Sequence, residues 1–120
     1  MRNLTYLTQT PDHFSLYMNH TDGKLETRQK EQLVNSLSFY KPDANLLIAF
    51  HPSQKIAYSY NHSDGTLDLF YYDGEGSFEH WYQEKIPKLM NPKLELLNNG
   101  KILKLSEDCS LNLLSDGSIK

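Results

Sequence analysis

The chain has 120 residues, of which 38% are hydrophobic and 22% charged, with a formal net charge of −3 at pH 7. This length and composition are typical of one folded globular domain, so we expect residues 1–120 to form a single domain and exclude a disordered chain. No stretch approaches the roughly 20 apolar residues of a membrane span, and the first residues lack the apolar run of a signal peptide, so we expect neither membrane insertion nor export.

The first elements are two short strands and a helix. Residues 4–8 and 13–19 alternate apolar and polar side chains, which predicts strands. Leu33, Leu37 and Tyr40 then recur at helical spacing after a segment rich in helix-forming residues, which predicts a helix from about residue 26 to 39. Its narrow apolar stripe suits packing against a sheet.

Two segments of the chain are near copies of each other. Asn19–Glu26 and Asn61–Asp68 share an Asn-His-x-Asp-Gly pattern at an offset of 42 residues. One interpretation is a pair of equivalent ligand sites, such as metal sites that use His and Asp. The other is that two hairpin turns converged on similar residues because Asn, Asp and Gly suit tight turns, and we favour this interpretation.

The middle of the chain predicts a buried strand at residues 46–50 and then an antiparallel meander from Ile56 to Glu84. Asp64-Gly65 suits a two-residue turn that places Ser63 opposite Thr66 and sets the register of the flanking strands. The apolar face of the meander then carries side chains that include Tyr58, Tyr60, Leu67, Leu69 and Tyr71. The opposite, mixed face carries Ala57, Ser59, Asn61, Asp68, Phe70 and Tyr72.

The third strand of the meander adds to the mixed face. If residues 73–76 form a four-residue loop, Ser77 lies opposite Tyr72, and Phe78, His80 and Tyr82 fall on the apolar face. Glu79 and Trp81 then join Asp68, Phe70 and Tyr72 on the mixed face.

The meander also concentrates charge and aromatic residues. Ile56–Glu84 holds six acidic residues, no Lys or Arg, and eight of the 14 aromatic residues, so the rest of the chain carries a formal charge of +3. Aromatic anchors beside charged groups are typical of protein interfaces. We therefore predict a partner-binding surface, unless the helix covers the mixed face and makes these residues core. The predicted surface consists of Asp68, Phe70, Tyr72, Asp73, Glu75, Glu79 and Trp81.

The last part of the chain contains a second hairpin signal. Asn99-Gly100 lies between two strand-like segments, and the expected register places Glu95 opposite Lys104 and Leu97 opposite Ile102. With the elements above, this predicts an α+β fold, in which an antiparallel, hairpin-rich sheet of about seven to nine strands packs against one helix.

The side-chain chemistry indicates no catalytic motif, cofactor site or metal site. The five histidines lack the spacing of zinc ligands, and Cys109 has no second cysteine to join it. If a metal site exists, His62, Asp64 and His80 could converge on it. No basic cluster suggests nucleic-acid binding. A single cysteine fits a reducing compartment, so we expect a cytoplasmic protein.

These observations predict a binding protein without catalytic residues. Its acidic, aromatic surface implies a basic protein partner. Small acidic proteins of this type include bacterial inhibitors, among them toxin-immunity proteins that neutralise nuclease toxins, and the chain is similar to them in type. The alternative is a small β-rich enzyme or ligand-binding protein, with a pocket on the mixed face built from Asp68, Tyr72, Glu79 and His80.

Overall fold

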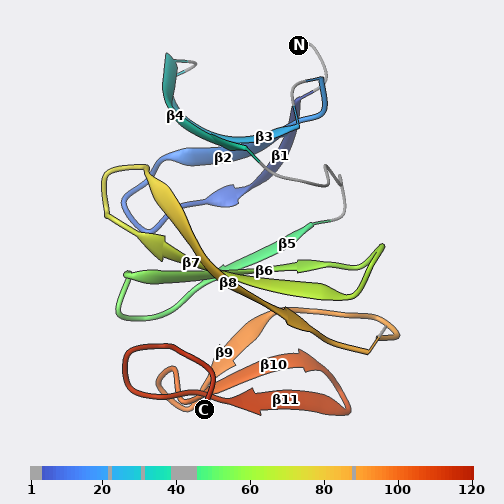
Figure 1. The fold of residues 1–120 in the computed structure, drawn as a ribbon. Coiled ribbons are helices and arrows are strands. Elements are labelled where there is room, and N and C mark those ends of the chain that lie inside the picture. Colours follow the sequence, from blue (N-terminus) through green and yellow to red (C-terminus); the bar gives the residue numbers. More distant parts are fainter. Residues whose placement is uncertain (1–3, 22, 31, 39–45, 88) are drawn as a thin grey trace.

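The chain folds into three antiparallel β-sheets stacked face to face (Figure 1). The computed structural model describes residues 4–21, 23–30, 32–38, 46–87 and 89–120. That part of the chain is all-β, and no helix occurs in it. The prediction of an α+β fold with one helix was therefore wrong. The same residues contain no helix with the length and apolarity that crossing a membrane requires.

The first sheet contains the segment that we expected to be helical. Its strands follow one another in space as in sequence: β1 (Leu4–Gln9), β2 (Ser15–Asn19), β3 (Lys24–Gln29) and β4 (Gln32–Ser38). Leu25 pairs with Leu37 and Arg28 pairs with Leu33, because an extra residue in β4 shifts the register between these pairs. Long-range strand pairing thus overrides a local preference for helix.

The other two sheets follow the same plan. The second sheet has four strands in chain order, and the third has three described strands with β10 in the middle. The second sheet consists of β5 (Leu47–Phe50), β6 (Ile56–Asn61), β7 (Thr66–Tyr72) and β8 (Phe78–Lys85), and the third of β9 (Glu95–Leu97), β10 (Ile102–Ser106) and β11 (Cys109–Asn112).

Two hydrophobic cores hold the stack together. The first lies between the first and second sheets and contains Leu16, Met18, Leu25, Leu46, Ala57 and Phe70. The second lies between the second and third sheets and contains Ile56, Tyr58, Tyr60, Leu67, Leu69, Ile86, Leu103, Leu105 and Leu113. The second sheet is therefore covered on both faces.

The first strands of successive sheets, β1, β5 and β9, lie next to each other. Successive antiparallel sheets that meet along their first strands are the arrangement of consecutive blades in a β-propeller. The architecture is thus a series of similar units rather than one continuous sheet.

The 42-residue repeat marks equivalent turns in the first two sheets. Asn19 ends β2 and accepts a hydrogen bond from the N–H of Thr21 at 3.0 Å, while Asn61 ends β6 and accepts one from Ser63 at 2.9 Å. Each turn closes with a glycine N–H bonded to the carbonyl of that asparagine, at 2.9 Å in both. Both copies are therefore hairpin turns, as we expected, and the offset of 42 residues matches the spacing of equivalent turns in two successive sheets.

We predicted the register of two hairpins, and the structure agrees with one prediction and differs from the other by two residues. In the third sheet Glu95 pairs with Lys104 and Leu97 with Ile102, which confirms the prediction. In the second sheet Asn61 pairs with Thr66, so four residues form the turn where two were expected. A shift by two residues leaves every side chain on its expected face of β6 and β7.

Candidate functional site

The mixed face of the meander is buried between two sheets. Asp68, Phe70 and Tyr72 are almost completely inaccessible to solvent. Phe70 belongs to the core shared with Leu16 and Met18 of the first sheet. These three residues therefore cannot contact a partner on the surface. The sequence allowed for a covered face, but the cover is a sheet and not a helix.

At the start of the third strand of the meander, the side chains lie on the faces opposite to those predicted. Tyr72 pairs with Phe78 and Tyr71 with Glu79, because residues 73–77 form the loop, which is one residue longer than expected. This shift by one residue moves Phe78, Glu79 and His80 to the faces opposite to those predicted, so the assignment of Phe78 and His80 to the apolar face was wrong. Beyond the bulge at Trp81 the predicted alternation returns, since residue 82 pairs with Leu69. Glu79 therefore lies on the face of Tyr71 and away from Asp68, and the assignment of Glu79 to the mixed face was wrong.

Trp81 also lies away from the mixed face. It occupies a β-bulge, since Phe70 pairs with His80 and Leu69 with Tyr82. Its ring stacks on Tyr71, with centroids 4.7 Å apart and planes at 22°. Trp81 is partly buried against the core between the second and third sheets, whereas Tyr71 is 44% exposed.

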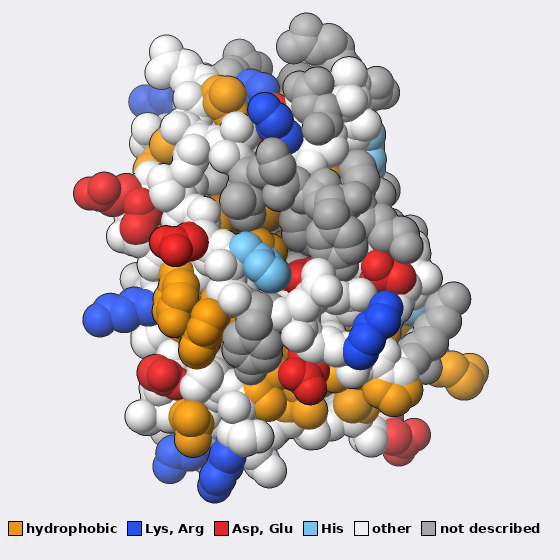
Figure 2. All heavy atoms as spheres, in the orientation of Figure 1, with side chains coloured by type: hydrophobic (Ala, Val, Ile, Leu, Met, Phe, Trp, Pro, Cys, Tyr) orange, Lys and Arg blue, Asp and Glu red, His pale blue; other side chains and the backbone are white. Residues whose placement is uncertain are grey.

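The exposed carboxylates of the predicted surface lie in the same strand pair as this aromatic pair and in the loop that joins its strands. We define the acidic ridge as Tyr71, Asp73, Glu75, Glu79 and Trp81, of which the three carboxylates are exposed. Figure 2 shows acidic and hydrophobic side chains next to one another at the left of the view, with a basic side chain near them. Lys55 lies at one end of the ridge, because its carbonyl accepts a hydrogen bond from the N–H of Tyr72 at 2.8 Å.

The loop that carries two of these carboxylates has a defined shape. Asp73 Oδ1 accepts hydrogen bonds from the N–H groups of Glu75 at 2.7 Å and Ser77 at 3.0 Å. Slight burial opposes ionisation of Asp73, but these hydrogen bonds outweigh it and lower the pKa of the carboxyl group. Asp73 therefore stays ionised to a lower pH than an ordinary aspartate does.

A histidine and a buried aspartate form a second polar cluster. His80 Nε2 lies 2.9 Å from Asp68 Oδ1, and Gln83 Nε2 donates to the same oxygen at 3.0 Å. The side chain of Asp68 is 1% exposed and that of His80 is 44% exposed. A carboxylate partner requires the proton on Nε2, so Nδ1 of a neutral His80 is the basic nitrogen. This arrangement orients an accessible base.

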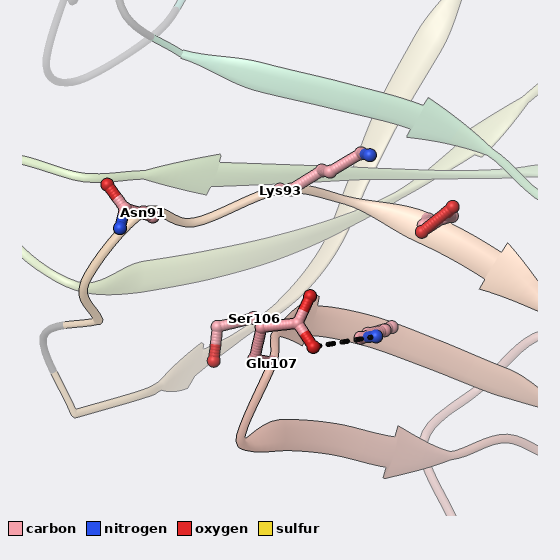
Figure 3. A pocket seen from close by; sticks show the side chains of 6 residues that line it. Asn91, Lys93, Ser106 and Glu107 are labelled. Atoms are coloured by element: carbon pink, nitrogen blue, oxygen red, sulfur yellow. Dashed lines mark ion pairs between the residues drawn. The ribbon is translucent and has the colours of Figure 1, made fainter.

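The third sheet carries a cavity of about 300 Å³ that the sequence did not indicate as a site (Figure 3). Lys104 Nζ lies 3.7 Å from Glu107 Oε2. Figure 3 shows Lys93 pointing away from Glu107. The lining residues are Asn91, Lys93, Glu95, Lys104, Ser106 and Glu107. The predicted pairing of Glu95 with Lys104 was the available signal, because it places both residues on one face.

The described part of the chain contains no candidate metal centre. No group of three or more His, Cys, Asp or Glu side chains there is placed to hold a metal ion. His62 Nε2 instead lies 3.1 Å from the carbonyl oxygen of Leu89, and His80 pairs with Asp68. The two histidines considered for a metal site with Asp64 therefore have other partners.

Comparisons with known proteins identify the fold alone. No family model and no curated protein matches the sequence. A protein from Lactobacillus plantarum superposes with a TM-score of 0.74 at 18% identity. A putative 6-phosphogluconolactonase from Bacteroides uniformis superposes with a TM-score of 0.72 at 15% identity. Each match covers 98% of this chain and 39% of the other, so the chain spans about two fifths of their length.

Proposed function

We propose that the chain is a binding protein that recognises a basic protein partner through the acidic ridge. The observation that carries this proposal is the stack of the exposed Tyr71 on the partly buried Trp81, with ring centroids 4.7 Å apart, together with three exposed carboxylates in the same strand pair and its loop. Stacked rings give a rigid apolar contact, and the carboxylates attract a cationic surface over a Debye length of about 8 Å. Neither the fold nor the comparisons bear on whether this partner is a toxin that the chain neutralises.

The acidic ridge contains only some residues of the surface predicted from the sequence. Asp68, Phe70 and Tyr72 stabilise the protein from within, whereas Asp73, Glu75, Glu79 and Trp81 remain at or near the surface and are joined by Tyr71. We also propose a cytoplasmic location, on the basis of Cys109, which is a free thiol.

Charge reversal on the ridge tests this function. Partners captured from the native host by the wild-type chain would be measured kinetically against the double variant Glu75→Lys with Glu79→Lys. We expect slower association and a weaker dependence on salt, because electrostatic attraction acts on the association rate. Tyr71→Ala should instead speed dissociation, by about tenfold or more for an anchor residue.

A matched control uses the double variant Glu107→Lys with Asp108→Lys, which makes the same charge change at two exposed positions after β10. This variant should associate as the wild type does. If the control and the ridge variant slow association equally, net charge alone explains the effect and the ridge is not the binding site.

A second candidate function follows from the pair of His80 and Asp68. The Bacteroides uniformis neighbour is named a putative 6-phosphogluconolactonase, and lactone hydrolysis needs a base that activates water. His80 is accessible, and the buried Asp68 orients it. Fold similarity does not by itself transfer activity. The two cavities described on the third sheet are not lined by either residue. The ridge therefore remains our main proposal.

Proton release from 6-phosphogluconolactone tests this second candidate. An enzyme that uses His80 should lose most of its rate in His80→Gln and keep it in His13→Gln, since His13 is an exposed histidine elsewhere. Equal rates for both variants and the wild type would rule out His80 as the base.

A further inference from the structure

The stack of sheets has two open faces at its opposite ends. The second sheet lies between the other two (Figure 1), and every residue of β6 is buried. The first and third sheets each turn one face toward it, through Leu16 and Met18 on one side and Leu103 and Leu105 on the other. Within the described residues, no sheet covers the outer face of the first or of the third sheet.

The outer face of the first sheet has the character of a packing surface. Tyr6 pairs with Tyr17, and Tyr17 with Glu26, so these side chains share the face with Arg28 and its partner Leu33. Tyr6 is 55% and Leu33 53% exposed, which is high for large apolar side chains. The rings of Tyr6 and Tyr17 lie edge to face with centroids 5.6 Å apart.

A buried carboxylate lies at the centre of this face. Glu26 is 4% exposed, and it accepts hydrogen bonds from Asn19 Nδ2 at 2.8 Å and Arg28 Nε at 2.8 Å. Burial opposes ionisation of Glu26, but these partners outweigh it and lower its pKa. The charge is thus satisfied within the sheet, so covering this face would leave no acidic group unpaired.

The internal repeat relates this face to one that is covered. Glu26 and Asp68 occupy the same position of the repeat, 42 residues apart. Asp68 is also buried and lies on the face of the second sheet that packs against the first. Its Oδ1 is hydrogen-bonded to His80 and Gln83 of its own sheet, whereas its Oδ2 has no hydrogen-bond partner. The outer face of the first sheet is therefore the counterpart of a face that binds a neighbouring sheet.

The outer face of the third sheet offers apolar side chains of its own. Leu97 pairs with Ile102 on this face, and Leu97 and Leu114 are exposed. A hollow of about 420 Å³ runs beside Ile102 and Leu114. The inner face of the same sheet, with Leu103 and Leu105, already packs against the second sheet.

We infer that these two outer faces bind each other between two copies of the chain. The outer face of the third sheet of one copy packs on the outer face of the first sheet of the other, which continues the face-to-face stacking within each copy. The reciprocal contact closes a ring. A head-to-tail contact closes when its rotation allows, and two copies supply six sheets, within the four to eight blades of β-propellers. This inference does not depend on the acidic ridge.

Light scattering on the 120-residue chain, measured across a concentration series after size-exclusion chromatography, tests the inference. We expect a dimer with twice the 13.9 kDa mass of one chain. Leu33→Asp and Leu114→Asp should each weaken the dimer by at least about tenfold, because each places a charge in one of the two contacting faces. Met90→Asp, which makes the same apolar-to-acidic change at an exposed side chain outside the strands, should leave the dimer intact.

Mixing the variants distinguishes the head-to-tail contact from other contacts. Leu33→Asp leaves the outer face of the third sheet unaltered, and Leu114→Asp leaves the outer face of the first sheet unaltered. One contact between these two variants is therefore intact, so an equimolar mixture should form more dimer than either variant alone. A monomer at about 100 μM wild-type chain, which is a concentration where even weak specific dimers form, overturns the inference. An effect of only one variant, or masses that grow beyond the dimer, overturns the head-to-tail ring. Circular dichroism checks that each variant is folded, and Leu33→Ser and Leu114→Ser replace any that is not.

Discussion

Tyr72 lies where the turn between β1 and β2 meets the loop between β7 and β8. Its hydroxyl donates to Asp12 Oδ1 at 2.5 Å and accepts from the N–H of Gly76 at 3.2 Å, while Thr10 Oγ1 donates to the same carboxylate oxygen at 2.6 Å. We predicted Tyr72 as a binding residue from its neighbours in the strand. The sequence could not show Asp12 beside it, because these residues lie 60 positions apart.

Titration of Tyr72 should weaken the fold at high pH. Burial, followed by the hydrogen bond to the Asp12 carboxylate, raises the pKa of Tyr72 to about 12 from its usual value of 10. The folded state thus favours the neutral phenol. Its contribution to stability is complete below pH 10 and is lost as the pH rises to about 12, by roughly 2 kcal/mol. Chemical denaturation at several alkaline pH values measures this loss.

The variant Tyr72→Phe serves as the control for that measurement. It cannot ionise, so its free energy of unfolding should fall less steeply over the same pH range. Burial also raises the pKa of Tyr60, which leaves a remaining slope in the variant. Parallel slopes for the wild type and Tyr72→Phe would show that Tyr72 is not the titrating group.

At the scale of elements, the segment from residue 24 to 38 shows how local signals mislead. Leu33 and Leu37 are spaced as on one face of a helix, yet they lie in β4 opposite Arg28 and Leu25. Two residues that are four positions apart can also lie in one strand, where regular alternation would put them on the same face. The extra residue of β4 lies between Leu33 and Leu37 and therefore places them on opposite faces. Pairing with β3 decides the matter, and that pairing depends on how the whole sheet assembles.

The hairpin between β9 and β10 was predicted correctly because its signal is local. Gly100 has a φ of 83°, which glycine adopts at little cost. Its position also has a tertiary role, since the carbonyl of Gly100 accepts a hydrogen bond from His51 Nε2 at 3.0 Å. A Cβ at Gly100 would lie 2.6 Å from that nitrogen. The turn therefore joins the second and third sheets.

Alanine at Gly100 should destabilise the protein more than alanine at Gly74. Both glycines have left-handed backbone, with φ of 83° and 80°, but a Cβ at Gly74 would meet nothing within 4 Å. The backbone should cost each variant about 1 kcal/mol, and the contact with His51 should add about 1 kcal/mol or more at Gly100 only. Urea denaturation of the two variants gives the difference. Equal losses would mean that His51 moves aside freely.

At the scale of the whole molecule, the second sheet couples the two cores. Phe70 belongs to the core shared with the first sheet, and Leu67 belongs to the core shared with the third. These residues come from the same strand, β7, and alternate between its faces. Loss of either core therefore removes support from the middle sheet, and the three sheets should unfold together.

Phe70→Ala and Leu67→Ala should each lower the free energy of unfolding of the whole chain by about 2 to 5 kcal/mol. Trp81 is the single tryptophan and packs against the second core, so its fluorescence reports on that core, while far-UV circular dichroism reports on all sheets. The two signals should change together in both variants. If Phe70→Ala shifts the dichroism but not the fluorescence, the first sheet unfolds independently.

The sequence by itself determined the features that depend on neighbours in the chain. Alternating side chains and Asn-Gly or Asp-Gly turns predicted the hairpins, the two face sets of β6 and β7, and the register of Glu95 and Lys104. The 42-residue repeat also predicted two similar hairpin turns, which the structure places at equivalent positions of the first two sheets.

Only the tertiary structure decided which faces are covered. From the sequence, Asp68 and Phe70 were equally compatible with an exposed surface and with a core. Alternation of side chains separates the two faces of a strand but does not show what packs on each face. The first sheet covers them, and a loop one residue longer than expected moves Glu79 to the other side. Burial arises from contacts between residues far apart in sequence, so no local pattern contains it.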